Sequence, residues 1–281
     1  MRVMVTGAAG MLGHDLVAAL AGEEVLPLTR RDADLAEAQA LARAAQSFRP
    51  EVVIHAAAYA DVDGCERDPA RAERENVVAT RHIAAFAAGL GAWLLHLSTD
   101  YVFDGAGGRP YRPDDATGPV NVYGKSKLAA EEEVRASGAR AAVVRTAWLV
   151  GPHGNNFVEA VRLRARRGEE LRVVDDQRGT PTFTFDLAPA LVALARRRPE
   201  GVLHLTNQGE CTRFEQARAI LELDGLDAPL VPVTSEESPR PARRPKYSVL
   251  DNSAANAILG RPLPPWRESL ARYLKEAGGA A

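Results

Sequence analysis

Short apolar runs alternate with segments of helical periodicity along the first 150 residues. Each run is too short for a helix and is rich in β-branched residues, which is typical of a strand. Strands are expected at residues 3–5, 24–28, 52–55, 93–97 and 141–146. Helices are expected between them, at residues 11–20, 33–47, 68–89 and 121–137. Because the runs are apolar throughout, they predict a parallel sheet covered on both faces, in a Rossmann-type doubly wound α/β fold.

The pattern changes after residue 150. Prolines concentrate between Pro229 and Pro265, and Thr212 with Glu215 has the spacing of a capping box in front of a short helix. A helical segment and a further apolar run near the middle of this half are expected to return to the main sheet. The segments expected for a dinucleotide-binding domain are 1–150 plus about 183–206, and those for a smaller α/β substrate-binding lobe are about 151–182 plus 207–281.

Composition and charge exclude several classes of protein. The chain is 46% hydrophobic and 26% charged, as in ordinary globular proteins. Its net charge of −2 produces no electrostatic field that would attract nucleic acid or an anionic membrane. No apolar stretch approaches the roughly 18 residues that span a bilayer, and the glycine turn comes too early for a signal peptide. We expect a cytoplasmic protein. Cys65 and Cys211 are far apart and lack metal-ligand spacing, so two buried free thiols are expected.

A glycine-rich turn follows the first strand directly. Gly7 allows the tight turn, Gly10 lets the backbone approach a pyrophosphate, and Gly13 lets the helix pack closely on the strand. The free N–H groups at the start of the helix attract phosphate. A structural turn is the alternative, but the position between strand and helix favours a dinucleotide site.

The residues at the end of the second strand indicate which cofactor the protein binds. An acid there would bind the ribose 2′-hydroxyl of NAD, whereas Arg30 can bind the 2′-phosphate of NADP. The alternative is that Arg30 and Arg31 are solvated and that Asp32 turns inward. We expect NADPH, with NADH as the second choice.

Tyr123 and Lys127 stand four residues apart on an expected helix and therefore share a face. A free phenol has a pKa of about 10, and a nearby ammonium lowers it. Tyr123 can then protonate a ketone oxygen as hydride reaches the carbon. Thr99, at the end of the fourth strand, can bind the same oxygen. The alternatives are a half-buried tyrosine beside a surface lysine, and a turn capped by Ser98 or Thr99.

These motifs resemble those of the extended short-chain dehydrogenase/reductases. The marks of that superfamily are T-G-x-x-G-x-x-G, the Ser-Thr-Asp run and Y-x-x-x-K. More specific segments resemble the dTDP-4-dehydrorhamnose reductase family, from end to end of the chain. They are residues 56–63, 98–105, 119–127, 145–150, 154–157, 175–182 and 241–245.

The resemblance implies a role for each matching residue. It assigns catalysis to Thr99, Tyr123 and Lys127. Around the cofactor it places Gly7, Met11, Leu12, Asp34, Leu35, Ala56, Ala57, Ala58 and Tyr59, and Lys127 on the nicotinamide ribose. Around the substrate it places Thr99, Asp100, Trp148, Asn156 and Arg178, with Arg243 or Arg244 at the pyrophosphate. A core position for Trp148 and a solvated loop for the two arginines remain the alternatives.

The resemblance also implies the reaction. It is the NAD(P)H-dependent reduction of the C4 ketone of dTDP-4-dehydro-6-deoxy-L-mannose to dTDP-L-rhamnose. The related 4,6-dehydratases carry an Asp-Glu pair after the threonine, whereas Asp100 is followed by Tyr101, which favours reduction. The alternatives are another nucleotide-sugar reductase or epimerase, and a non-catalytic protein like the regulatory subunit of methionine adenosyltransferase. Some members of the family bind Mg²⁺ at a dimer contact. A homodimer is expected, but no ligand cluster in the sequence indicates a metal.

Overall fold

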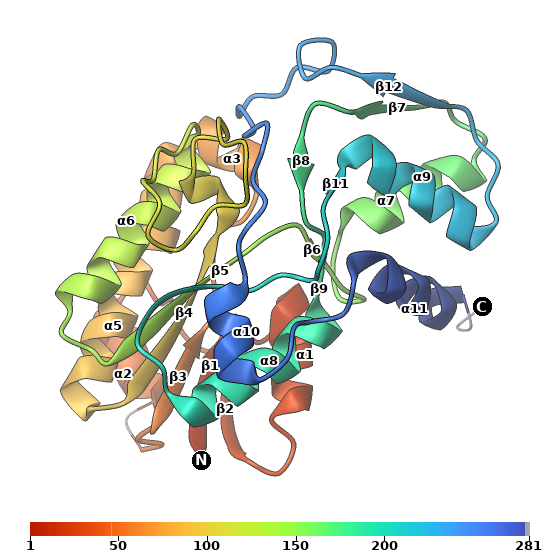
Figure 1. Ribbon diagram of the computed structural model, residues 1–281. Coiled ribbons are helices and arrows are strands. Elements are labelled where there is room, and N and C mark those ends of the chain that lie inside the picture. Colours follow the sequence, from red (N-terminus) through yellow and green to blue (C-terminus); the bar gives the residue numbers. More distant parts are fainter. Residues whose placement is uncertain (46, 279–281) are drawn as a thin grey trace.

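A sheet of six parallel strands forms the centre of the molecule, as predicted (Figure 1). The computed structural model describes residues 1–45 and 47–278. The strand order is β10-β5-β4-β3-β1-β2. The strands are β1 (Arg2–Thr6), β2 (Glu24–Leu28), β3 (Val52–His55), β4 (Trp93–Thr99), β5 (Ala141–Thr146) and β10 (Gly201–His204). Every residue of β3 and β4 is buried, which explains why these runs read as apolar without alternation.

Helices cover both faces of the sheet (Figure 1). Side chains of a strand point alternately to its two faces, so Val3 and Val5 enter one core and Met4 enters the other. The first core is closed by α1 (Met11–Ala19), α8 (Thr184–Arg197) and α10 (Ser253–Leu259). The second core is closed by α2 (Ala38–Ala45), α5 (Ala79–Leu90) and α6 (Val122–Ala136). This confirms the doubly wound α/β fold.

The strand order reverses between β1 and β3, and the backbone is tightly packed there. Gly7 has φ +72°, and a Cβ on it would lie 2.7 Å from the Ala57 nitrogen. A Cβ on Gly13 would lie 2.1 Å from the Gly7 oxygen. Glycine is therefore required at both positions, and α1 begins directly above the crevice at the switch point, where ligands of such sheets bind.

Two expected helices differ from the observed ones. The helix expected over 33–47 is α2 (Ala38–Ala45), and Gln46 lies outside the described residues, as do the expected lobe residues 279–281. The helix expected over 68–89 consists of α4 (Pro69–Ala72), a π-helix η1 (Glu73–Val78) and α5. The π segment carries Asn76, whose side chain binds the backbone of Tyr59 and Ser126 Oγ, and these contacts accompany the wider turn.

A separate hydrophobic core gathers residues from the second half of the chain. It is built on α7 (Phe157–Arg166), β7 (Leu171–Val174), α9 (Arg213–Asp224), β12 (Leu230–Val233) and α11 (Trp266–Gly278). The short strands β6 (Leu149–Val150), β8 (Arg178–Gly179), β9 (Thr182–Phe183) and β11 (Cys211–Thr212) connect it to the main sheet, and α3 (Val62–Arg67) with the 3-10 turn η2 (Asp100–Val102) borders the crevice. The capping box of Thr212 and Glu215 is confirmed. The division into two domains at the expected boundaries stays a prediction.

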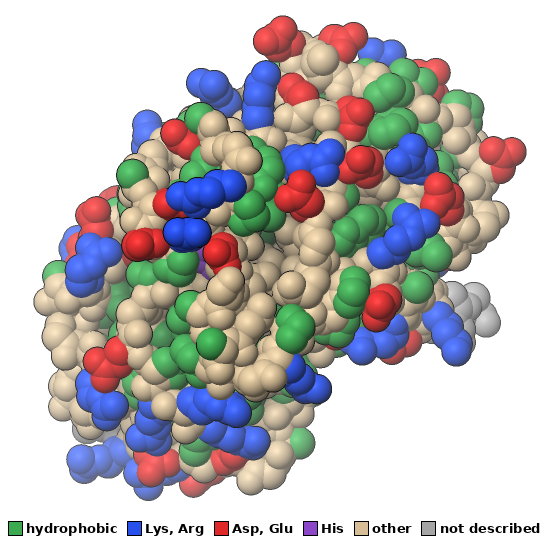
Figure 2. Space-filling view, in the orientation of Figure 1, with side chains coloured by type: hydrophobic (Ala, Val, Ile, Leu, Met, Phe, Trp, Pro, Cys, Tyr) green, Lys and Arg blue, Asp and Glu red, His purple; other side chains and the backbone are tan. Residues whose placement is uncertain are grey.

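The surface carries mixed charge. Figure 2 shows positive and negative side chains interspersed over one face. Within residues 1–45 and 47–278, no helix is both long and apolar enough to cross a membrane.

The contact of Gly13 with the Gly7 oxygen makes a stability prediction. Gly13→Ala should lower the free energy of unfolding by about 1–3 kcal/mol or more, because backbone cannot move aside as a flexible side chain can. Gly89→Ala in α5 is the matched control, since its Cβ would enter open space and a helical alanine stabilises slightly. Denaturant unfolding of both variants checks this. Equal stability of the two variants would show that the turn can relax.

Candidate active site

Three cavities line the crevice at the carboxyl ends of the strands. The central cavity, of about 450 Å³, is lined by Thr99, Asp100, Tyr123, Lys127 and Trp148. The glycine-side cavity, of about 380 Å³, is lined by Arg30, Asp34, Leu35, Ala57 and Tyr59. Both are bordered by Gly7, Gly10, Ala56 and Ala58, and the central one also by Met11, Leu12 and Gly13. The structure thus brings the expected catalytic and cofactor residues into two adjoining spaces.

Thr99 ends β4 at the wall of the central cavity. Its hydroxyl donates to Asp100 Oδ1 at 3.0 Å and accepts from the Tyr101 N–H at 3.2 Å. The hydroxyl therefore caps η2 as well as facing the cavity. The two readings of this residue from the sequence are compatible, because an oxygen that caps a turn at the end of a strand still borders the crevice.

Tyr123 lies in the first turn of α6, where the Asn121 side chain caps the helix by accepting from the Gly124 N–H at 2.7 Å. The ring of Tyr101 packs edge-on against it, with centroids 5.9 Å apart. The surrounding protein desolvates the phenol and raises its pKa above the usual range, and the Thr99 hydroxyl acts in the opposite direction. The expected lowering of this pKa is therefore wrong for this arrangement, because desolvation is the dominant effect.

Lys127 is buried one helical turn below Tyr123. Its ammonium donates to the Leu97 carbonyl at 2.6 Å and lies 3.3 Å from His96 Nε2. Burial lowers the pKa of Lys127 to about 8, and Glu131 opposes that shift. The ammonium is thus anchored on β4 rather than on the phenol, and it stays charged at neutral pH with its remaining donor capacity at the cavity.

Two buried oxygens of the central cavity have no hydrogen-bond partner among the described residues. They are Asp100 Oδ2 and Thr146 Oγ1. Burial raises the pKa of Asp100 to about 6, and the hydrogen bond from the Thr99 hydroxyl acts in the opposite direction. Since buried polar atoms are almost always paired, these oxygens suit the hydroxyl groups of a bound molecule.

The glycine turn fits a dinucleotide. Gly10 is the N-cap of α1, and no side chain caps that helix end. The N–H groups of the first turn therefore have no intrahelical acceptor and, together with the helix dipole, suit a pyrophosphate between the two cavities. Farther along the glycine-side cavity, the Arg71 guanidinium lies 4.1 Å from the centroid of the Tyr59 ring. The flat ring and the arginine suit a nucleoside.

Trp148 has a positive φ of +45°, lines the central cavity and packs, half-buried, against the edge of the hydrophobic core of the second half of the chain. The Arg213 guanidinium stacks on one face of its ring at 3.5 Å from the centroid, and Gly179 approaches closely enough that a Cβ would lie 2.6 Å from the indole. The ring is therefore held by contacts with an arginine and a glycine.

Sequence reasoning missed Arg213, which lines both the central cavity and a third one. Arg213 occupies the first position of α9, directly after the capping threonine. A cation in the first turn of a helix is unfavourable beside the positive end of the helix dipole. This unfavourable position was the signal in the sequence that Arg213 has a role other than stabilising the helix. Burial lowers the pKa of this guanidinium, so an anion beside it would offset the cost of desolvation.

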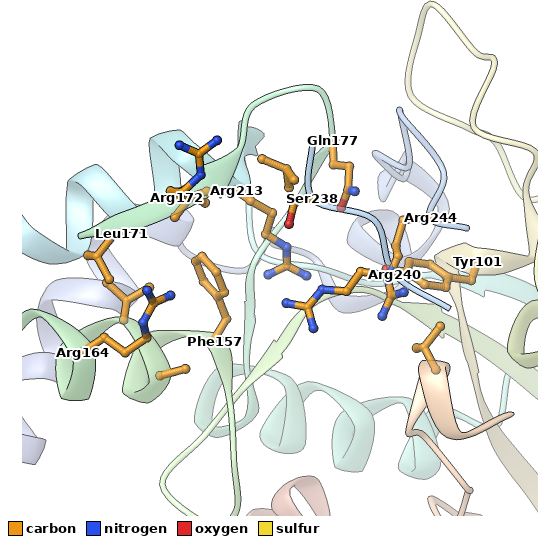
Figure 3. A pocket seen from close by; sticks show the side chains of 15 residues that line it. Tyr101, Phe157, Arg164, Leu171, Arg172, Gln177, Arg213, Ser238, Arg240 and Arg244 are labelled. Atoms are coloured by element: carbon orange, nitrogen blue, oxygen red, sulfur yellow. The ribbon is translucent and has the colours of Figure 1, made fainter. Parts of the chain in front are cut away.

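The third cavity, of about 440 Å³, is called the arginine cavity here after Arg164, Arg172, Arg213, Arg240 and Arg244 (Figure 3). Arg244 donates to Asp63 Oδ1 at 2.5 Å, whereas Arg213 and Arg240 form no ion pair with the carboxylates that the structure describes. Figure 3 shows their guanidinium groups pointing toward the same space. This cavity therefore has positive charge available for a phosphate group.

Asn156 and Arg178 lie elsewhere, outside the walls of the three cavities. Asn156 caps α7, and its amide donates to the Gly151 carbonyl at 2.9 Å. Arg178 lies between Glu210 and Glu215, 3.5 and 3.4 Å from their carboxylates. Both side chains are engaged in holding loops and a helix end. Their expected position at the nucleotide gains no support from the structure.

Comparisons with known proteins agree with this geometry. Residues 1–278 match the family described as RmlD substrate binding domain. The dTDP-4-dehydrorhamnose reductase of Mycobacterium tuberculosis (strain ATCC 25618 / H37Rv) is 46% identical, over 97% of this chain and 92% of its own. The dTDP-4-keto-6-deoxy-D-glucose reductase of Streptomyces niveus is 41% identical, over 96% and 95% of the two chains.

A solved structure gives the same result. The dTDP-4-dehydrorhamnose reductase of Bacillus anthracis str. Ames, in complex with NADP, superposes with a TM-score of 0.94 at 34% identity, covering 98% of this chain and 99% of the other. The match extends over both the sheet and the separate hydrophobic core of the second half of the chain. The chain therefore belongs to the RmlD substrate binding domain family, the dTDP-4-dehydrorhamnose reductases that its motifs resemble.

Proposed function

We propose that this protein is an NAD(P)H-dependent oxidoreductase that reduces the C4 ketone of dTDP-4-dehydro-6-deoxy-L-mannose to dTDP-L-rhamnose. The observation that carries the proposal is the shared cavity of Thr99, Tyr123 and Lys127, which reaches the glycine turn. A proton donor, a carbonyl-binding hydroxyl and an ammonium thus lie within reach of one small molecule beside a dinucleotide site. The 46% identity to a reductase named for this substrate supports the proposal.

Tyr123 supplies the proton and Thr99 holds the oxygen. The nicotinamide, when bound, supplies the hydride. The raised pKa keeps the phenol protonated at neutral pH, which is the form a general acid needs. As negative charge develops on the ketone oxygen, the Thr99 hydroxyl turns from Asp100 Oδ1 to this oxygen, so that it and the phenol both donate to it. Lys127 stabilises the phenolate that remains and binds the ribose next to the nicotinamide.

The unpaired polar groups of the cavities indicate how the substrate is bound. Asp100 Oδ2 and Thr146 Oγ1 accept sugar hydroxyls, and the Trp148 ring packs on the sugar. Arg213 joins the central cavity to the arginine cavity, so it binds the diphosphate, with Arg244 or Arg240 beyond it. The substrate-binding lobe is then the part of the chain around the separate hydrophobic core that is built on α7, α9 and α11.

NADPH is the proposed cofactor, with NADH as the second choice. Arg30 at the end of β2 lines the glycine-side cavity and can bind a 2′-phosphate. The NADP complex of the Bacillus anthracis reductase supports this choice. The cytoplasm and a homodimer stay predictions. In the described part of the chain no three His, Cys, Asp or Glu side chains are grouped to hold a metal ion.

A second candidate is the reduction of another dTDP-4-keto-6-deoxy sugar. The Streptomyces niveus relative, at 41% identity, is named for a D-glucose derivative. Both candidates use the same proton donor and differ in the stereochemistry of the sugar that is reduced. Oxidation of NADPH measured against a panel of dTDP- and UDP-4-keto sugars separates them. Failure with every sugar would overturn the proposal.

The proton-donor role gives a kinetic prediction. Tyr123→Phe should lower kcat by about 10²–10⁴-fold and leave the dissociation constant of NADPH nearly unchanged, because only the transferred proton is lost. Tyr247→Phe is the control, since that hydroxyl contacts Glu210 outside the central cavity. Steady-state kinetics and cofactor titration give both quantities. Turnover within a factor of about two of the parent would remove Tyr123 from the mechanism.

The lowered pKa of Lys127 gives a pH prediction. The ammonium is charged below a pH of about 8 and loses its proton above it, so cofactor affinity and kcat should both fall as the pH rises through that value. Lys127→Met should have low cofactor affinity and low kcat at every pH, and neither quantity should fall further as the pH rises through about 8. The measurement is the pH profile of kcat and of the NADPH dissociation constant. A parent profile that stays flat well above pH 8 contradicts the assignment.

Arg213 and Arg178 give a paired prediction on substrate binding. Arg213→Ala should raise the KM for the dTDP sugar about tenfold or more and spare NADPH affinity, because a charged hydrogen bond to a phosphate is lost. Arg178→Ala, which breaks two glutamate contacts outside the cavities, should leave that KM unchanged. Both KM values and the melting temperatures decide the matter. The reverse result would restore Arg178 to the nucleotide site.

A further inference from the structure

The glycine-side cavity ends in a group of four charged side chains. Arg30, Asp34, Arg71 and Glu75 all line it, near the end of β2. In a sheet of this topology the adenosine ribose of a dinucleotide lies at that strand end, and the groups there distinguish a 2′-hydroxyl from a 2′-phosphate. Sequence reasoning considered Arg30 and Asp32 in this role and left Glu75 out.

Glu75 connects the two arginines of this group. Its carboxylate accepts from Arg71 Nε at 2.8 Å and forms an ion pair with Arg30 Nη2. The Glu75 side chain is 13% exposed, whereas those of Arg30 and Arg71 are 70% and 43% exposed. The carboxylate is therefore the most buried member of the cluster, and the two arginines are more exposed.

The π-helix η1 puts this carboxylate in the cavity wall. Its next residue, Asn76, accepts from the Tyr59 N–H at 2.7 Å and donates to the Tyr59 carbonyl at 3.2 Å. Tyr59 in turn carries Arg71 on its ring face. Glu75, Arg71 and Tyr59 are therefore one connected wall, and the irregular helix turn is part of how it is built.

The four side chains carry two positive and two negative charges. Glu75 is shared by the two arginines of the cavity, and Asp34 accepts at 2.6 Å from Arg74, which lies outside the cavity wall. A 2′-phosphate brings a charge of about −1.5 to −2 at neutral pH, so it must draw Arg30 away from Glu75 and approach a carboxylate. A 2′-hydroxyl is neutral and can donate to that same carboxylate. Both effects favour the cofactor without the phosphate.

We propose that Glu75 is a specificity-determining residue of the cofactor site, which competes with the 2′-phosphate for Arg30 and Arg71 and keeps the preference for NADPH over NADH small. This rests on the proposed function only in taking a nicotinamide dinucleotide as the ligand. Arg30 alone would give a site for NADPH, and Arg30 paired with Glu75 gives a site that accepts both cofactors.

The test is titration calorimetry of NADP⁺ and NAD⁺, together with the fragments adenosine 2′,5′-bisphosphate and AMP. Glu75→Gln keeps the shape of the side chain and removes its charge. The ratio of the NAD⁺ to the NADP⁺ dissociation constant should rise about three- to tenfold, as expected for a partly exposed ion pair, and the fragment pair should follow it. Arg30→Ala should cost more NADP⁺ affinity in the Glu75→Gln background than in the parent.

Glu73→Gln is the matched control. It removes the same charge from the same π-helix, but the Glu73 side chain is exposed and lies outside the wall of the cavity. Its ratio of dissociation constants should equal that of the parent. A melting temperature for each variant shows that the fold is kept.

Two results would overturn the proposal. An unchanged ratio in Glu75→Gln would show that the carboxylate does not reach the 2′ position. A ratio that falls would show that Glu75 orients the arginines for the phosphate instead of competing with it. A parent protein that binds neither dinucleotide would overturn this proposal and the proposed function together, whereas binding with an unmoved ratio would overturn only the role of Glu75.

Discussion

The close approach of three backbone segments at the switch point of the sheet supports the rest of the site. Gly7 packs on the backbone of Ala56 and Ala57, and Gly13 packs on the Gly7 carbonyl, at distances that leave no room for a Cβ. This contact sets the N-terminus of α1 at the boundary of the central and glycine-side cavities. A single helix end can then serve a long ligand that extends into both. Every other group of the site is placed relative to this point.

Desolvation governs the chemistry of the central cavity. It raises the pKa of Tyr123 and of Asp100 and lowers that of Lys127, so each group is shifted toward its neutral form. The protein limits this effect where charge is needed, since the Glu131 carboxylate raises the pKa of Lys127 against the effect of burial. The result is a protonated phenol and a charged ammonium at neutral pH, in a space where developing negative charge interacts strongly with both.

Arginine is used differently in the two outer cavities. In the arginine cavity Arg213 is held by stacking on Trp148, and its charge is left for a ligand. In the glycine-side cavity Glu75 takes up the charge of Arg30 and Arg71. The sequence alone does not distinguish the arginines of one cavity from those of the other. The difference lies in which carboxylates the fold brings to each of them, and it decides how strongly each cavity attracts phosphate.

The sequence by itself determined the sheet, the glycine turn and the set of Thr99, Tyr123 and Lys127, because these depend on local periodicity and on spacing along one strand or one helix. It also placed Gly7 and Arg30 near the crevice from their positions after the first and second strands, and Ala57 and Trp148 through family motifs. Only the tertiary structure decided the direction of the Tyr123 pKa shift, since burial and the anchoring of Lys127 on β4 come from packing between elements. The same holds for Arg213, Glu75 and Arg178, since their partners Trp148, Arg30 and Glu210 come from elements distant along the chain. Pairings of this kind are fixed by how helices and loops pack, and no periodicity in the chain records them.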